Sequence, residues 1–118
     1  METIERLAQA AVERDHLQLR SLVQDLTRAK TDFSRTPRPQ TRNALLLSMS
    51  AALTELLASR QNQHPPSWTR EIGPAAEPFF LLESVAHMKR LRELCETQSP
   101  EPLRKRNLYA PPHFLEFA

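Results

Sequence analysis

Glycine is almost absent from this chain, which has one glycine, Gly73, and ten prolines among 118 residues. Glycine supplies the positive-φ turns and the close backbone approaches that phosphate-binding loops, dinucleotide fingerprints and tight hairpins require. The sequence therefore excludes P-loop, Rossmann and α/β-hydrolase sites and disfavours an all-β fold. Aromatic residues make up only 6% of the chain, so the core is expected to be aliphatic.

The length is that of a single domain, since domains typically run to roughly 100–150 residues. Cys95 is the only cysteine, which excludes an internal disulfide and a paired-cysteine zinc site, and a lone thiol of this kind is typical of core packing. Charged residues run through the first fifteen positions, unlike a signal peptide. No apolar run approaches the roughly 20 residues of a membrane span. A soluble, cytoplasmic protein without membrane contact is expected.

The apolar spacing predicts an all-α fold: a compact array of four to five helices in one domain over residues 1–118, with two proline-rich loops and an ordered C-terminal tail. The segments are one or two helices over 1–30, a loop over 31–40, a central helix over 41–60, a Trp/Pro loop over 61–78, a helix over 79–96, and a short helix with an aromatic tail over 99–118. The broad apolar face of the central helix predicts contacts on more than one side.

Local signals place several ends of these helices. Asp15, with Gln18 three residues later, resembles a helix N-cap with its reciprocal partner, which favours two helices within 1–30 over one continuous helix. Thr41 or Asn43 could cap the central helix. Phe33 is expected to anchor the first proline-rich loop to the core.

The second proline-rich loop contains the only tryptophan, Trp68. A short turn from Ser67 to Glu71, capped by Ser67, is expected around it. Trp68 is then either a structural anchor, which is the commoner role, or an exposed contact residue. Beyond this loop, the steps from Leu81 through Val85 and Met88 to Cys95 predict the helical face of 79–96.

The C-terminal segment has its own helix signals. Ser99 followed by Pro100 and an acidic residue predicts a short helix with a serine cap. Asn107 suits its end, because asparagine tolerates left-handed backbone geometry.

Residues suited to catalysis are scattered. The four histidines fall in separate segments without metal-ligand spacing, and no nucleophile lies beside a base in the sequence. We therefore expect no catalytic residue, no metal, no cofactor and no enzymatic activity. The formal net charge of +2 is too small to indicate general affinity for nucleic acid. A DNA-binding regulator and a self-associating helical protein, such as a homodimer, remain as alternatives to a protein-binding module.

Five stretches carry a resemblance to a known family: LRSLVQDL at 19–26, PPSWTREIG at 65–73, EPFFLL at 77–82, LRELCE at 91–96 and SPEPLRKRNLYAPPHFLEFA at 99–118. They resemble a family of small bacterial helical proteins encoded beside predicted nucleotidyltransferases of the toxin–antitoxin type. The resemblance implies an antitoxin-like protein that binds and neutralises such a transferase.

The same resemblance suggests the surface of contact, because a nucleotidyltransferase cleft is lined with carboxylates. A basic segment flanked by aromatic residues could enter such a cleft. The alternative is that the basic trio caps its own helix while the aromatic tail, Phe117 included, completes the core. The candidate partner-binding residues are Arg104, Lys105, Arg106, Asn107, Tyr109, His113 and Phe114, and the candidate loop contacts are Trp68, Phe79 and Phe80.

Overall fold

The computed structural model describes residues 3–116, and its fold is all-α, with 58% helix and 4% strand. The α-helices are α1 (Thr3–Val12), α2 (His16–Arg28), α3 (Ala44–Arg60), α4 (Lys89–Gln98) and α5 (Glu101–Arg104). Three short 3-10 helices, η1 (Phe33–Arg35), η2 (Ser67–Glu71) and η3 (Glu83–Ala86), and two short strands, β1 (Phe79–Phe80) and β2 (Leu108–Tyr109), complete the described chain.

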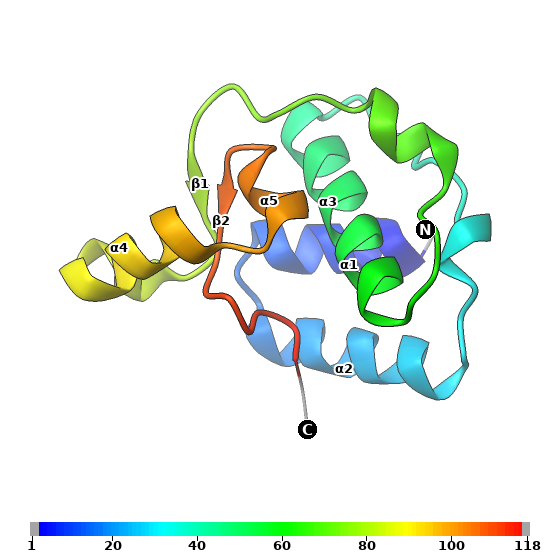
Figure 1. Cartoon of the computed structure of the whole chain (residues 1–118), viewed down its shortest axis with the longest axis horizontal. Helices are drawn as coiled ribbons and strands as arrows, with labels where there is room; N and C mark the ends of the chain where they lie inside the picture. Colours follow the sequence, from blue (N-terminus) through cyan, green and yellow to red (C-terminus); the bar gives the residue numbers. More distant parts are fainter. Residues whose placement is uncertain (1–2, 117–118) are drawn as a thin grey trace.

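Helix α3 is the centre of the molecule (Figure 1). Every residue from 48 to 58 is buried, and α1, α5, η1 and η2 all pack against this helix. The predicted central helix with contacts on several sides is therefore confirmed, although it begins at Ala44 rather than Thr41. Asn43 is its cap, since its side-chain Oδ1 accepts a hydrogen bond from the Leu46 N–H at 3.0 Å.

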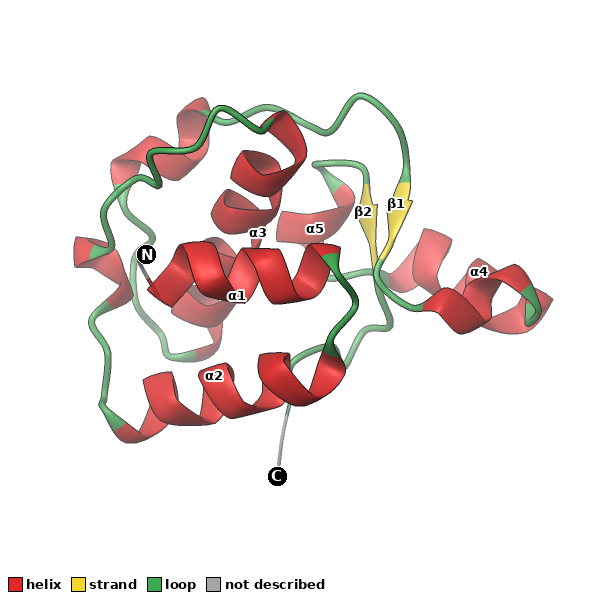
Figure 2. Cartoon of the chain, turned by 180° about the vertical axis from the view of Figure 1, so that it is seen from behind, coloured by secondary structure: helices red, strands yellow, loops and turns green. Residues whose placement is uncertain are grey.

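Helices α1 and α2 run antiparallel and side by side (Figure 2). The predicted break between them is confirmed: Arg14 adopts a φ of 56°, and the Asp15 carboxylate accepts from the Gln18 N–H at 3.1 Å. The reciprocal half of the predicted cap is absent, because the Asp15 N–H donates instead to the Ala10 carbonyl at 2.9 Å.

The two proline-rich loops are tied to each other. Phe33 is buried, as predicted, and the Gln63 side chain accepts from the Phe33 N–H at 2.7 Å and donates to the Thr31 carbonyl at 3.1 Å. The Trp68 Nε1–H donates to the Thr36 carbonyl at 2.7 Å. The expected turn around Trp68 is present as η2, but it lacks a side-chain cap at its start, so the expected Ser67 cap is wrong.

Trp68 is half-buried, and its replacement by alanine is expected to lower the free energy of unfolding by about 2 kcal/mol. Fully buried tryptophans cost about 3–5 kcal/mol on truncation, and exposed residues cost less than about 0.5 kcal/mol. Trp68→Phe keeps most of the ring and loses the hydrogen bond to Thr36, so about 1 kcal/mol is expected for that variant. Urea denaturation measures both values, and a loss below about 0.5 kcal/mol for Trp68→Ala would refute the anchoring role.

The predicted helix over 79–96 is wrong in its first half, because α4 begins only at Lys89. The backbone of β1 instead pairs in parallel with β2, with Phe79 opposite Leu108 and Phe80 opposite Tyr109. The Phe79 N–H donates to the Asn107 carbonyl at 3.0 Å, a bond to a distant segment that replaces a helical one. Among the residues of the predicted helical face Leu81, Val85 and Cys95 are buried, but Met88 is 53% exposed.

The C-terminal segment follows its prediction in part. Helix α5 has Pro100 rather than Ser99 at its N-cap, because the Ser99 hydroxyl is engaged with Ala110, accepting from its N–H at 2.9 Å and donating to its carbonyl at 3.0 Å. Asn107 has the predicted left-handed φ, 65°. Phe114 and Leu115 are buried, while Phe117 lies outside the described residues.

Within residues 3–116, no helix has both the length and the apolar character that crossing a bilayer demands.

Candidate functional site

The structure separates the three basic residues that the sequence grouped together. Arg106 is only 3% exposed, and its guanidinium forms a bidentate pair with Glu55, at 2.7 Å to Oε1 and 3.0 Å to Oε2. It also donates to the carbonyls of Thr69 at 2.8 Å and Pro102 at 3.0 Å. The prediction that Arg106 contacts a partner is therefore wrong, because this side chain is occupied in joining α3, η2 and α5.

Glu55 is the acidic side of this junction. Burial by itself raises the pKa of its carboxyl, but hydrogen bonds from Arg106, Lys105 and Thr69 outweigh burial and bring the pKa to about 2. Glu55 is not among the residues predicted from the sequence, although a signal exists: it is the only charged residue between Asn43 and Arg60. A charge inside an apolar helix requires an opposite charge elsewhere in the fold.

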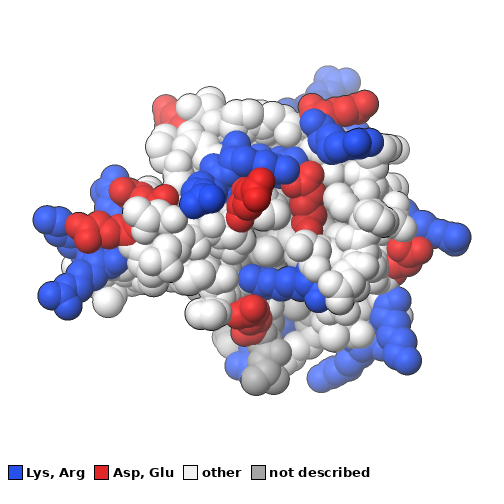
Figure 3. Space-filling view, in the orientation of Figure 1, with Lys and Arg blue, Asp and Glu red and all other residues white. Residues whose placement is uncertain are grey.

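The other two basic residues remain at the surface. Arg104 is exposed and donates to the Thr97 carbonyl at 3.0 Å. The Lys105 Nζ lies 2.9 Å from Glu55 Oε1, with its side chain 48% exposed. Charges of both signs are interspersed over the face in Figure 3, which displays no single broad basic field.

The two residues predicted as partner contacts in the tail, His113 and Phe114, differ in their exposure. His113 is exposed, and its Nδ1 lies 2.7 Å from the Glu116 carboxylate. Phe114 is 8% exposed and belongs to the hydrophobic core. The alternative in which this part of the tail completes the core therefore applies to Phe114, which is not free to contact a partner.

The structure does bring four of the predicted residues together, because β1 lies beside β2. The rings of Phe80 and Tyr109 stack, with centroids 5.2 Å apart and planes 29° apart. The Tyr109 hydroxyl donates to Asn107 Oδ1 at 3.1 Å, and the Asn107 amide donates to the Ala75 carbonyl at 3.3 Å. Phe79 lies next in β1 and packs partly against the core. Trp68, in contrast, is not part of this group, and its indole N–H donates to the Thr36 carbonyl.

Two arginines cover these phenylalanines. The Arg14 guanidinium carbon lies 4.6 Å from the Phe79 ring centroid, and its Nε–H donates to the Phe80 carbonyl at 2.9 Å. The Arg92 guanidinium carbon lies 5.2 Å from the Phe80 centroid, and its Nε pairs with Glu96 at 2.8 Å. Both placements are cation–π contacts. Neither arginine is among the residues predicted from the sequence, because the contacts depend on how the α1–α2 turn and α4 meet β1.

A hollow of about 550 Å³ lies against this group. We call it the aromatic–arginine pocket, and its lining residues are Arg14, Pro78, Phe79, Phe80, Leu82, Glu83, Val85, Ala86, His87 and Arg92. Phe79 and Phe80 are half-buried, so their ring edges are partly open to a ligand. The lining combines aromatic rings, aliphatic side chains, two guanidinium groups, the Glu83 carboxylate and the His87 imidazole, a composition suited to contact with another protein.

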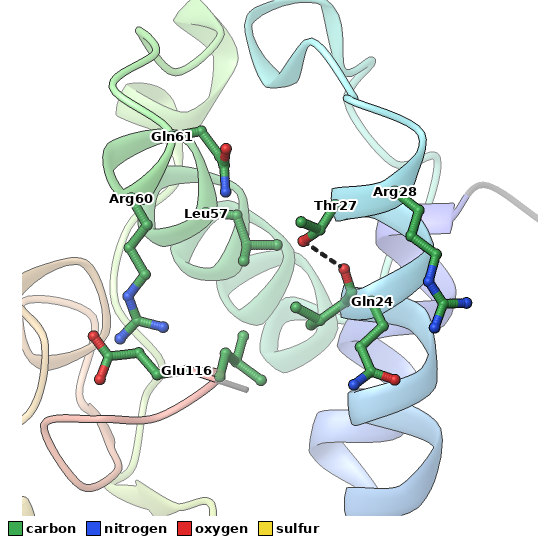
Figure 4. Close-up of a pocket in the computed structure, with 9 residues that line it drawn as sticks. Gln24, Thr27, Arg28, Leu57, Arg60, Gln61 and Glu116 are labelled. Atoms are coloured by element: carbon green, nitrogen blue, oxygen red, sulfur yellow. Dashed lines mark hydrogen bonds between the residues drawn. The ribbon is translucent and has the colours of Figure 1, made fainter. Parts of the chain in front are cut away.

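Another hollow, of about 710 Å³, is a groove between α2, the end of α3 and the tail (Figure 4). Val23, Leu57 and Leu115 contribute its apolar side chains, and its polar residues include Gln24, Arg28 and Gln61. Some of its hydrogen-bonding groups are already used within the fold. The Thr27 hydroxyl donates to the Val23 carbonyl at 2.9 Å, and Arg60 donates to the Phe114 carbonyl. Burial lowers the pKa of Arg60, while the nearby Glu116 carboxylate opposes this shift.

No protein-family model, curated protein or solved structure matches this chain. Over residues 3–116 there is also no group of three or more histidine, cysteine, aspartate or glutamate side chains placed to hold a metal ion. Cys95, the buried thiol, has its pKa raised by burial and by the neighbouring Glu96, which disfavours the thiolate.

Proposed function

We propose that this chain is a non-catalytic, antitoxin-like binding module of the cytoplasm that holds a partner protein at the aromatic–arginine pocket. One observation carries the proposal: two adjacent, half-buried phenylalanines, each under an arginine guanidinium, line a hollow of about 550 Å³. Aromatic and arginine side chains are enriched in the centres of protein interfaces and contribute most of their binding energy.

The chemistry of the pocket indicates the kind of partner. Phe79, Phe80 and Leu82 offer apolar contact, and Arg14 and Arg92 offer donors for carboxylates. An acidic surface with an apolar side chain at its centre would satisfy both groups. The resemblance to proteins encoded beside nucleotidyltransferases suggests such a transferase, whose cleft is lined with carboxylates. Binding over that cleft would neutralise it.

The test is co-expression with the product of the neighbouring gene, which the proposal requires to be a nucleotidyltransferase, followed by affinity purification and titration of the purified partners. Phe80→Ala is expected to weaken binding about 30-fold, since loss of a central aromatic contact costs about 2 kcal/mol. Arg92→Glu is expected to weaken it similarly by placing a negative charge against an acidic surface. The transferase should lose activity in the complex with the unmodified chain.

Arg90→Glu is the matched control, because Arg90 is exposed on the same helix but does not line the pocket. It is expected to bind as the unmodified chain does. Circular dichroism and urea denaturation establish that each variant is folded. Absence of a complex, or equal affinity of the Arg90→Glu and Arg92→Glu variants, would contradict the proposal.

A further inference from the structure

A smaller hollow of about 230 Å³ lies where η2 and the segment after it meet the turn that follows α5. Its lining residues are Arg70, Ile72, Pro74, Lys105 and Arg106. Two hydrogen bonds hold these segments together. The Arg106 side chain donates to the Thr69 carbonyl at 2.8 Å, and the Ala75 N–H donates to the backbone carbonyl of Arg106 at 2.9 Å. Three cationic side chains from segments 35 residues apart therefore line one hollow.

The charge around this hollow is unbalanced. Glu55 is ion-paired with Arg106 and Lys105, and its pKa of about 2 keeps it ionised. Arg70 has no ion-pair partner in the described part of the chain. Three cations beside one carboxylate leave a formal charge of +2.

Arg106 also has a side-chain donor without a partner, and because this nitrogen is buried the residue contributes positive charge to the hollow rather than an exposed donor. Of the buried side-chain nitrogen and oxygen atoms in residues 3–116, its Nε alone lacks a hydrogen-bond partner. Its two terminal nitrogens are held by Glu55, so the guanidinium is fixed in position near Lys105, whose side chain is 48% exposed, and the exposed Arg70. A compact anion would compensate the excess positive charge at this place.

We propose that this hollow binds a phosphate group, either as free phosphate or as the phosphate of a small molecule. Arginine and lysine together are the usual ligands of phosphate oxygens. The volume of about 230 Å³ is below the roughly 300–1,000 Å³ of pockets that hold drug-sized ligands, so the hollow suits a phosphate group rather than a whole larger ligand. Ile72 and Pro74 bound it on the apolar side. This site shares no lining residue with the aromatic–arginine pocket and is independent of the function proposed there.

Isothermal titration of the full chain with inorganic phosphate, pyrophosphate and AMP tests the proposal, with sodium chloride at matched ionic strength as the blank. All three probes are expected to bind, because each presents a phosphate group. Arg70→Ala and Lys105→Ala are each expected to weaken binding at least tenfold, and the double variant should abolish it. Phosphate should also raise the melting temperature of the unmodified chain more than chloride does, because it binds only the folded form.

Arg104→Ala is the matched control, since Arg104 precedes Lys105 and is exposed but does not line the hollow. It should bind phosphate as the unmodified chain does, and Arg70→Lys should retain most of the affinity. Arg70 and Lys105 are both exposed residues, so their variants are expected to fold. Binding no stronger than the chloride blank, or undiminished binding by the double variant, would overturn the proposal.

Discussion

Arg106→Ala is expected to lower the free energy of unfolding by about 3–5 kcal/mol. Removing one member of a buried ion pair leaves the other charge without a partner, and this accounts for most of the cost. Here the substitution leaves the Glu55 carboxylate, which is 6% exposed, with only the half-exposed Lys105 as an ion-pair partner. The substitution also removes the donors to Thr69 and Pro102, which hold η2 and α5 in place. Urea denaturation followed by circular dichroism measures the loss.

Two controls separate this explanation from a general loss of positive charge. Arg104→Ala removes an exposed arginine two residues away and should change stability by less than about 0.5 kcal/mol. The double variant Glu55→Leu with Arg106→Met replaces both charges by apolar groups and should recover most of the stability, as apolar replacements of buried ion pairs often do. If Arg104→Ala and Arg106→Ala cost the same, the buried pair does not have the role assigned to it.

Acid is expected to destabilise the protein by on the order of 3 kcal/mol through Glu55 alone. The pKa of this carboxyl falls from its ordinary value of 4.5 to about 2 in the folded chain. Between these values the unfolded chain binds the proton and the folded chain does not, so stability decreases as the pH decreases. Each pH unit between the two pKa values is worth about 1.4 kcal/mol. The contribution is complete above about pH 4.5 and lost near pH 2.

Comparison with Glu55→Gln isolates this contribution from those of other carboxyl groups. Asp32, for example, also has a lowered pKa, mainly through its hydrogen bond with the Ser34 hydroxyl, but it is an exposed residue. Both proteins are denatured with urea at several pH values between 7 and 2.5. The difference between their unfolding free energies should shrink as the pH falls, and a constant difference would show that Glu55 does not keep a lowered pKa in the fold.

Local signals predicted much of the helical framework. The Asp15 cap and the apolar face of the central helix each depend on residues that lie close together in the sequence, and both are present in the structure. The helix predicted from residue 79 shows the limit of prediction from local apolar spacing. Leu81, Val85 and Cys95 are buried as their spacing suggested, but they lie on or beside β1, in η3 and in α4 rather than on one helix. The pairing of β1 with β2 decides this, and it involves residues almost thirty positions apart.

The candidate sites were predicted less well, for a related reason. Phe79, Phe80 and Tyr109 were selected for their residue type, but their proximity depends on the strand pairing, and the arginines over them come from α4 and from the α1–α2 turn. The RKR run looked uniform in the sequence, yet one residue of the three is buried against Glu55. Glu55, the lone acidic residue of an apolar helix, was the available sign that a basic residue elsewhere in the chain would be buried against it.

The central position of α3 also determines how the molecule can open. Because α1, α5, η1 and η2 share this one helix as their support, none of them can detach without exposing apolar surface that the others help to cover, so they should behave as one cooperative unit. Helix α4 extends away from the body and packs mainly on η3 (Figure 1). We therefore expect α4 to unfold locally while the elements packed on α3 stay folded.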